Sequence, residues 1–499
     1  MQIRPDVQGP QWSADGLDIA RGRYPLSVER HVMRMVDRLV PAVTAVTPHG
    51  RYYALHGLIA AESDRLNLDV ASSMKLLRRA EVALAAVSFA HHDGGDIGWL
   101  PRAHGVDALS KQLSTGALHI AEAAVAGKGG YVQSDSGFWN PYAGSEVTLG
   151  ILLSAARPTS GPQLDEPAVR AGLGDLLDLA AQETLQVAQL KAVGDKLCVC
   201  AGGSQADGRW LSNLMCAPGA QDTNTRAHLR RQTIRLLARI VDTHDIDRFT
   251  RDVGNVFAFG KFLTTDHVTS GIETAALWRG TILRNYPVGA WRRLWSWLVE
   301  QVGGQTVSSD ELADAFADQL PGNTSVAALV NALPPTQDAD EIPLPAERNL
   351  REVEAYTLPL AELQVLAVST RRIDELTGRT RDTFLGQRGV ELGPEWFARR
   401  LSEAGPQQLR DFARRLTSDL LDRALRVALS KARRRPDGTL WLPTRLHQNA
   451  GLLFATSSEG RGDVGLRLDQ MGSVLASSGV LAYTDGHWTL TQTGRSLVA

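Results

Sequence analysis

The residues best suited to chemistry are a histidine and an aspartate, His92 and Asp93, which directly follow an apolar helical run at residues 76–90. Adjacent imidazole and carboxylate groups can hold a divalent cation, and such a cation activates water for hydrolysis. A second interpretation needs no metal: Asp93 caps a helix, and Gly94 and Gly95 turn a polar loop between helices. We favour the loop, with the metal site as the alternative.

The same pair resembles the centre of HD-type metal phosphohydrolases. This resemblance implies that His56, on the preceding helix, is a further ligand and that Asp242 or Asp245 is the distant one. The chain departs from that family just after the pair, where glycines replace a lysine- or histidine-bearing continuation. A metal-dependent phosphohydrolase or nuclease using His56, His92 and Asp93 is therefore the second hypothesis. A divalent metal is expected only under it, and the leading hypothesis assigns no catalytic residue and no cofactor.

The cysteines are a second candidate cluster. Cys198, Cys200 and Cys216 are the only three in the chain. Cysteines at alternate positions of an extended segment face the same way, and with Cys216 and His228 they can be drawn as a zinc site. The spacing matches no Cys-x-x-Cys motif, so we favour buried free thiols. An odd cysteine count also fits a reducing cytoplasm better than an exported, disulfide-bonded protein.

Basic residues gather near the end of the chain. From residue 409 apolar residues recur at helical spacing, and arginines occupy the opposite side of the same predicted helix. Further cations follow, up to a turn at 436–438. The candidate nucleic-acid or partner surface comprises Arg414, Arg415, Arg423, Arg426, Lys431, Arg433, Arg434 and Arg435. Such a surplus can neutralise phosphates, but the solvated face of an ordinary helix has the same pattern. Residues 431–435 are predicted to be a basic helix end.

Near the end of the chain the spacing of the apolar residues changes from helical to extended. A helical pattern at 466–475 is followed by two extended runs around Asp485-Gly486 and by a short closing helix. This order resembles the end of a winged-helix domain, which we place at about 440–499. Its helix carries Arg467, Asp469 and Gln470 and is nearly neutral, so its residues do not support sequence-specific DNA reading. A docking or structural role is favoured over a winged-helix transcription factor.

These segments indicate a mainly α-helical, multi-domain protein with a small C-terminal α+β winged-helix unit. The predicted domains are an N-terminal helical domain at 1–157 and a central helical domain at 163–332. The central domain contains a tryptophan-rich helical hairpin broken near Pro287. A proline-rich acidic linker at 333–346 then leads to a C-terminal domain at 347–499.

Composition limits the function only loosely. The 499 residues include 53 Lys and Arg against 55 Asp and Glu, a net charge of -2, so binding of a polyanion must depend on local charge. The first residues lack the apolar core of a signal peptide, and no apolar run reaches the roughly 18 residues of a membrane span. We expect a cytoplasmic protein without a membrane partner.

Three segments resemble a loosely defined, largely uncharacterised group of bacterial proteins associated with phage defence. They are residues 39–53, the pair of runs at 277–279 and 283–284, and residues 431–442. The resemblance implies a context and carries no catalytic motif. The leading hypothesis is a non-catalytic scaffold or adaptor in a bacterial defence or DNA-associated complex. Its expected partners are other subunits of that complex, with duplex DNA as a further candidate.

Overall fold

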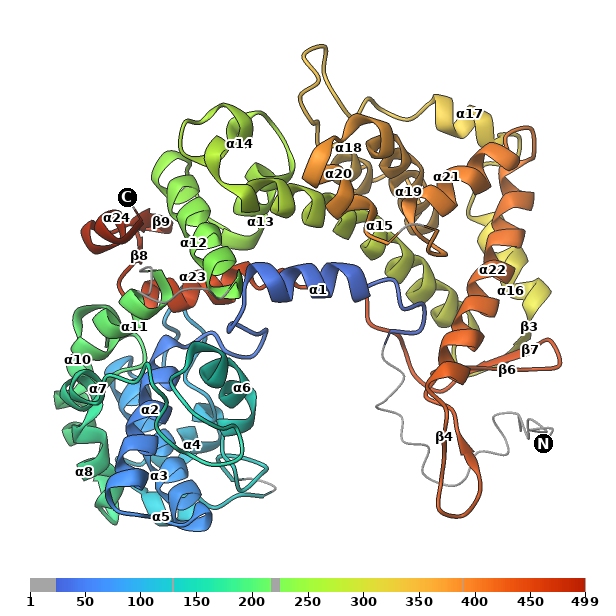
Figure 1. The fold of residues 1–499 in the computed structure, drawn as a ribbon. Coiled ribbons are helices and arrows are strands. Elements are labelled where there is room, and N and C mark those ends of the chain that lie inside the picture. Colours follow the sequence, from blue (N-terminus) through green and yellow to red (C-terminus); the bar gives the residue numbers. More distant parts are fainter. Residues whose placement is uncertain (1–23, 128–129, 217–224, 388, 499) are drawn as a thin grey trace. The chain divides into compact units, whose positions relative to one another are not determined.

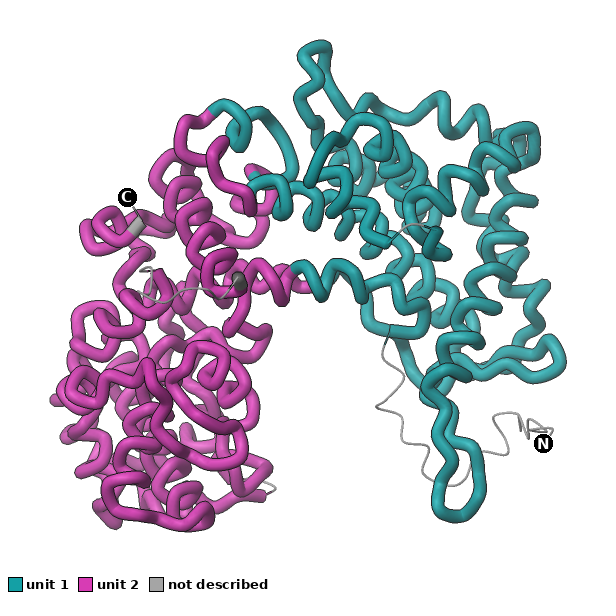
Figure 2. The backbone as a smooth tube through the Cα atoms, viewed as in Figure 1, with its two compact units in different colours: residues 1–35, 257–265, 275–464 teal, residues 36–256, 266–274, 465–499 magenta. Residues whose placement is uncertain are grey.

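The computed structural model describes residues 24–127, 130–216, 225–387 and 389–498. This part of the chain is mainly helical, as the sequence predicts, and its strands are short (Figure 1). It forms two compact units, coloured separately in Figure 2. Unit 1 comprises residues 1–35, 257–265 and 275–464, and unit 2 comprises residues 36–256, 266–274 and 465–499.

These units differ from the predicted domains because each is assembled from segments far apart in the sequence. The predicted winged-helix unit at about 440–499 is divided, with 440–464 in unit 1 and 465–499 in unit 2. The predicted linker at 333–346 lies inside unit 1. There the fully buried Arg372 donates hydrogen bonds of 2.7 Å to the carbonyl oxygens of Thr336 and Leu344. A buried cation must be compensated, so this segment is a packed loop.

Unit 2 contains most helices of the first half of the chain and three later ones. They are α2 (Gly50–Arg65), α3 (Val70–His91), α4 (Val106–Leu113), α5 (Ile120–Ala123), α6 (Trp139–Leu149), α7 (Glu166–Leu173), α8 (Asp175–Ala181), α9 (Val187–Ala192), α10 (Gly194–Leu197), η2 (Ala201–Ser204), α11 (Ala206–Cys216), α12 (Thr225–Thr243), η3 (Thr269–Gly271), α23 (Leu468–Ser477) and α24 (Gln492–Val498). Helix α2 is buried from Gly50 to Ser63. A helix buried on all sides is the centre of its unit.

Unit 1 contains most helices of the second half. They are α14 (Phe262–Thr265), α16 (Ser309–Asp318), α17 (Val326–Asn331), α18 (Ala346–Arg351), α19 (Leu358–Glu375), α20 (Gly378–Leu385), α21 (Pro394–Glu403) and α22 (Leu409–Ser430). Three further helices contribute residues to both units: α1 (Arg30–Leu39), α13 (Phe249–Ala258) and α15 (Glu273–Val302). Ser308 and Glu311 form a capping box that fixes the start of α16.

In the part of the chain that the structure describes, the strands form four small antiparallel sheets. Their members are β1 (Ala117–His119) with β2 (Thr184–Gln186), β3 (Thr306–Ser308) with β7 (Leu452–Ala455) and β6 (Leu446–Asn449), β4 (Arg433–Arg434) with β5 (Leu440–Trp441), and β8 (Leu481–Thr484) with β9 (His487–Leu490). Asp485 and Gly486, both at positive φ, connect β8 to β9 as the sequence predicts. The predicted order of helix, hairpin and closing helix is present at 468–498.

The predicted tryptophan-rich hairpin is wrong, because α15 is one helix of 30 residues with Pro287 inside it. A proline within a helix costs about 3 kcal/mol or more. The helix also carries Trp278, Trp291 and Trp295, each at most 2% exposed. Burying one such ring, at 150 Å² or more, contributes about 4 kcal/mol. Packing of the helix on several sides therefore outweighs the local preference of proline to end it.

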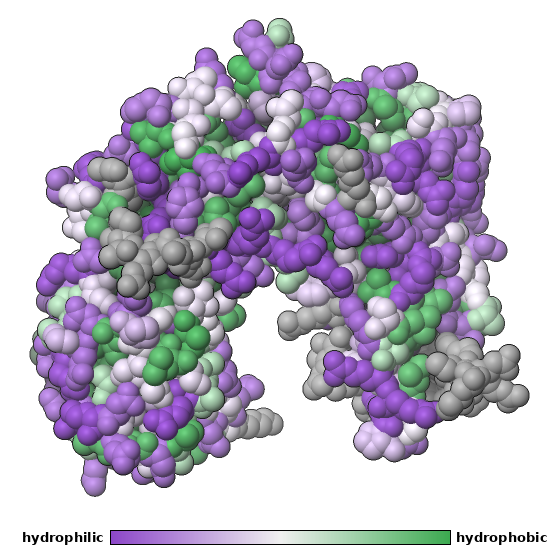
Figure 3. Space-filling model, in the orientation of Figure 1, coloured by the Kyte–Doolittle hydropathy of each residue, from purple (hydrophilic) through white to green (hydrophobic). Residues whose placement is uncertain are grey.

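On the face drawn in Figure 3, hydrophobic residues stand in small groups among hydrophilic ones. The large exposed apolar side chains of unit 1 include Leu429, Leu440 and Leu452. No helix in the described residues combines the length and the apolar character needed to cross a membrane.

Candidate metal centre

The candidate centre begins at the C-terminal end of α3. This helix ends at His91, and His92 is its C-cap residue. Asp93 and Gly94 follow with φ of 49° and 76°, and the Gly94 N–H donates to the carbonyl oxygen of Phe89 at 2.8 Å. A left-handed turn of this kind stops a helix sharply. The two histidines are therefore held at a rigid helix end, ahead of the predicted loop.

The other half of the centre is the segment between α10 and η2, which carries Cys198 and Cys200. It is fastened to α3 by a hydrogen bond of 3.0 Å from the Val199 N–H to the Ser88 hydroxyl. Gly194 allows the close approach, since a Cβ at that position would lie 2.3 Å from Nδ1 of His91. A glycine is required there because no larger residue fits.

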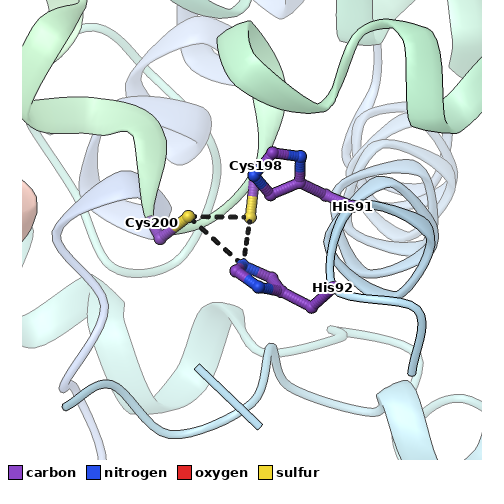
Figure 4. A group of neighbouring side chains, drawn as sticks. All are labelled: His91, His92, Cys198 and Cys200. Carbon is purple, nitrogen blue, oxygen red and sulfur yellow. Dashed lines mark hydrogen bonds between the residues drawn. The ribbon is translucent and has the colours of Figure 1, made fainter. Parts of the chain in front are cut away.

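The four side chains converge (Figure 4). Nε2 of His92 lies 3.4 Å from the sulfur of Cys198 and 3.4 Å from that of Cys200, and the two sulfurs are 3.1 Å apart. With His91 included, each residue offers one ligand atom, and all four atoms lie within 4.8 Å of one another. Ligand atoms around a tetrahedral zinc ion stand about 3.3 to 3.8 Å apart, given bond lengths of about 2.0 to 2.3 Å. The cluster is thus close to the size of a single-ion site.

The donor set also suits zinc. Two thiolates and two imidazoles in tetrahedral arrangement are a common structural zinc set. A two-iron cluster with the same ligands divides them between two metals, with both histidines on one iron. That arrangement spreads the ligands more widely than this group. The geometry therefore favours one ion over a cluster.

The two thiols are electrostatically unequal. A hydrogen bond from the Cys200 thiol lowers the pKa of Cys198 to about 5, although burial opposes this shift. The same hydrogen bond, together with burial, raises the pKa of Cys200. At neutral pH the pair therefore holds one thiolate and one proton. Thiolate is the form that binds metals, so metal binding would release the remaining proton.

The structure does not bring together the residues of the HD-type hypothesis. His56 is fully buried, with Nδ1 2.7 Å from Glu146 and Nε2 3.2 Å from Glu81. The Asp93 carboxylate is exposed and accepts from Lys191 at 2.7 and 3.0 Å, which lowers its pKa. Of that set only His92 belongs to the four-residue group.

The proposed distant aspartates are also engaged elsewhere. Asp242 pairs with Arg495 at 3.2 Å, and Asp245 with His487 at 2.6 Å. Asp245, Asp247 and His487 form a second group of possible ligand atoms, which is exposed to half-exposed. It contains no residue of α3. The predicted ligands have the expected order along the chain, but they do not lie close together in space.

His56 has a different role, as a buried bridge between two carboxylates. Burial lowers its pKa, but Glu146 and Glu81 outweigh this effect and raise it to about 9. In the unfolded chain the pKa is about 6.5. A folded pKa above the unfolded one stabilises the fold below about pH 6.5, and this contribution is lost as the pH rises through about 9.

We therefore expect the melting temperature to fall between about pH 6.5 and pH 9. Glu146→Gln removes the largest influence that raises the pKa of His56, so in this variant the decline should be smaller and should end at lower pH. Glu122→Gln removes an exposed carboxylate from the same unit and is the matched control. Calorimetric scans across this pH range give the comparison. Parallel curves for the two variants would contradict this role for His56.

Four of the eight cations of the predicted basic surface have partners on neighbouring elements. Arg414 contacts Asp314 at 2.6 Å and Asp411 at 2.9 Å. Arg423 and Arg426 share Glu391, at 3.3 and 2.6 Å. Lys431 donates to the carbonyl oxygen of Tyr24 at 3.1 Å. The helix face is therefore largely neutralised by its neighbours.

Three of the remaining four cations stand on the hairpin of β4 and β5. Helix α22 ends at Ser430, so the predicted basic helix end at 431–435 is wrong, and Arg433 and Arg434 form β4. Both are exposed, as is Arg415 on α22, and within the described ranges no carboxylate lies in ion-pair distance of these three. Arg435 is half-buried and lowers the pKa of Asp437 in the turn. The uncompensated charge thus lies mainly beyond the helix.

The three cysteines are free thiols, two of them buried, and the alternative zinc set with Cys216 and His228 does not converge. Cys216 is buried away from the group, and burial raises its pKa to about 12. His228 hydrogen-bonds Gln232 at 2.9 Å. The sequence does contain the two pairs of ligands, in His91-His92 and in Cys198-Val199-Cys200. Because these runs lie far apart along the chain, the sequence alone does not indicate that they meet.

Known proteins give no further guide to the site. No protein-family model matches this chain, and no curated protein or solved structure matches it.

Proposed function

We propose that this protein is a non-catalytic scaffold or adaptor whose unit 2 is stabilised by a zinc ion bound to His91, His92, Cys198 and Cys200. The observation that carries the proposal is the convergence of these four ligand atoms within 4.8 Å. The expected setting, a bacterial defence or DNA-associated complex, comes from the sequence resemblance.

A structural role for the ion follows from the number of ligands. Structural zinc sites have four protein ligands, whereas catalytic sites have three and leave one position for water. Cys198 is buried, and the other three residues are half-buried, so the ion would be largely enclosed. Asp93, the obvious acid or base beside the histidines, is paired with Lys191. The site thus offers a cross-link between α3 and the segment after α10.

Metal analysis tests the proposal. Full-length protein purified without chelator is expected to contain about one zinc per chain, and its cobalt-substituted form should have the absorption of tetrahedral cobalt with thiolate ligands. Asp93→Asn should retain the metal and any protection against phage. A disulfide between Cys198 and Cys200 in metal-free protein would overturn the zinc site. Loss of protection in a folded Asp93→Asn variant would favour the metal-dependent enzyme instead.

A second candidate function is binding of nucleic acid through the hairpin of β4 and β5. The observation that favours it is the exposure of Arg433 and Arg434 on a narrow two-stranded element (Figure 1). Arginines free of carboxylates can pair with phosphates without first breaking an ion pair. We therefore propose that a polyanion contacts this hairpin and not α22.

The double variant Arg433→Gln and Arg434→Gln is expected to weaken duplex binding and to flatten its salt dependence. Each phosphate contact contributes about 0.9 to the slope of log affinity against log salt, so the slope should fall by about 1.8. Arg414→Gln with Arg426→Gln removes the same charge from carboxylate-paired positions and is the control. Fluorescence anisotropy at several salt concentrations measures both. Equal slopes for the two double variants would reject the hairpin.

The C-terminal helix, hairpin and helix are proposed as a winged-helix-like structural element. Eight residues of α23 are buried, from Leu468 to Ser477. Arg467, at its start, pairs with Asp37 at 2.6 Å, and the Asp469 carboxylate accepts from the Thr250 N–H at 3.0 Å. A helix packed in this way cannot enter a major groove. These contacts support a packing role and weigh against a transcription factor.

A further inference from the structure

A second group of possible metal ligands lies in unit 2 and shares no residue with the centre formed by the histidines and cysteines. It consists of Asp245 and Asp247, in the segment between α12 and α13, and of His487, the first residue of β9. One ligand atom from each lies within 4.8 Å of the other two. The three side chains are 78%, 57% and 46% exposed, so ions in solution can reach the group.

Main-chain contacts hold the two aspartates beside β9. Ile246, which stands between them, is 1% exposed, and its carbonyl oxygen accepts from the Trp488 N–H at 2.9 Å. The Asp252 carboxylate accepts from the N–H groups of Asp247 and Arg248 at 3.1 and 2.8 Å. The segment is therefore anchored by a buried side chain and by three hydrogen bonds, which place both carboxylates against the histidine.

The two carboxylates converge with the histidine as their only cationic partner among the described residues. Asp245 and Asp247 each lie within ion-pair distance of His487, and of no lysine or arginine in that part of the chain. Arg251 interacts electrostatically with Asp247, but its hydrogen bond goes to Asp252 at 2.7 Å. Two neighbouring carboxylates repel each other, and one imidazolium compensates only half of their charge. The group therefore carries excess negative charge that a divalent cation neutralises.

The position of the imidazole nitrogen also suits a shared ion. Nδ1 of His487 lies 2.6 Å from Oδ1 of Asp245 and 2.7 Å from Oδ1 of Asp247, yet it forms a hydrogen bond with neither oxygen. Adjacent ligand atoms around one octahedral cation stand about 3.0 Å apart when the bonds are about 2.1 Å long. Both oxygens belong to exposed side chains, so a movement of about 0.4 Å admits an ion to the nitrogen.

We propose that Asp245, Asp247 and His487 bind a divalent cation such as Mn²⁺. Carboxylates favour Mg²⁺ and Mn²⁺, and an imidazole moves the preference away from Mg²⁺ toward the transition metals. Three protein ligands leave coordination positions for water or for a further ligand. The site is thus of the open kind, unlike the closed zinc centre.

The site adjoins a groove of about 560 Å³ in the same unit. Asp247 is one of the lining residues, together with the half-buried rings of Trp99 and Tyr483 and the exposed Arg248. No carboxylate of the described residues lies within ion-pair distance of Arg248, so its guanidinium can bind an anion. The ion would therefore hold an anionic small molecule in this groove, with Arg248 as a second contact and the rings against its apolar part.

Titration of the full-length protein, as purified, with manganese chloride tests the proposal, with free Mn²⁺ measured by electron paramagnetic resonance. We expect about one Mn²⁺ per chain, with a dissociation constant between about 1 µM and 1 mM, because three exposed ligands bind less tightly than a closed site. Asp245→Asn and His487→Gln keep the shape of the group, and each should weaken binding at least about tenfold. Asp242→Asn removes the same charge from a carboxylate paired with Arg495 and should bind as the wild type.

Bound Mn²⁺ should also broaden the ring-proton NMR signals of His487, which are identified by their absence in His487→Gln. Three results would overturn the proposal. Absence of Mn²⁺ binding up to about 5 mM would show that the group is only an ion pair of a protonated His487 with two carboxylates. Unchanged affinity in both Asp245→Asn and His487→Gln, or bound Mn²⁺ that leaves the His487 signals sharp, would place the ion elsewhere. The Mn²⁺ count is separate from the zinc content, so this site and the zinc centre can fail independently.

Discussion

Replacing Cys198 with serine is expected to remove the bound metal and to lower the stability of the protein more than any surface change. A serine hydroxyl stays protonated at neutral pH and is a poor zinc ligand. Structural zinc contributes about 10 to 16 kcal/mol in isolated zinc-finger peptides. In a larger fold most contacts persist without the ion, so we expect a loss of about 3 kcal/mol, roughly 6 °C or more in melting temperature.

The control for this prediction is Cys216→Ser. Cys216 is also buried in unit 2 but lies outside the four-residue group. This variant should lose some packing energy and still retain one zinc per chain. A strong chelator should lower the melting temperature of the wild type toward that of Cys198→Ser and leave Cys198→Ser unchanged. Equal metal content in the wild type and Cys198→Ser would show that the group is not the site.

Arg51→Leu is expected to have the second large effect, because Arg51 connects α2 to the cysteine segment. Its guanidinium contacts both oxygens of Asp207, at 3.0 and 3.1 Å. It also donates to the carbonyl oxygens of Lys196 and Cys198, at 2.7 and 2.9 Å. Arg51 and Asp207 are each 1% exposed. Removing one partner of a buried ion pair costs about 3 to 5 kcal/mol, since the other charge stays buried.

The same substitution should also weaken zinc binding. Groups that hold metal ligands in place typically change affinity by about 10- to 100-fold when they are removed. Denaturant unfolding gives the stability, and competition with a zinc indicator gives the affinity. Arg65→Leu, at the exposed C-terminal end of α2 and paired with Glu62, is the matched control and should change neither. If Arg51→Leu retains wild-type zinc affinity, Arg51 supports the fold without positioning the ligands.

The sequence predicted those elements whose signals are local. The apolar run at 76–90 lies within α3, the helical stripe that starts at residue 409 is α22, and Asp485-Gly486 turns the hairpin of β8 and β9. A helix or a tight turn depends on residues a few positions apart, so one segment contains all the information. The mainly helical class follows from many such segments.

Local signals misled where packing opposed them. Pro287 predicted a break in a helix, but the burial of three tryptophans keeps α15 continuous. The stretch at 333–346 has the composition of a linker, yet Arg372 holds it inside unit 1. Arg414, Arg423 and Arg426 were expected to form a free basic face, but carboxylates from other elements meet them. In each instance the deciding partner lies elsewhere in the chain.

The sequence by itself determined the helical elements, the turn chemistry and the supply of imidazoles, thiols and guanidiniums. Only the tertiary structure decided which of them meet. His91 and His92 reach Cys198 and Cys200 because a left-handed turn ends α3 and because Gly194 lets the second segment approach. In unit 1, Glu29 and Glu459 likewise line one pocket although they lie near opposite ends of the chain. Periodicity and propensity act over a few residues, whereas burial and charge pairing act between segments that become neighbours only on folding.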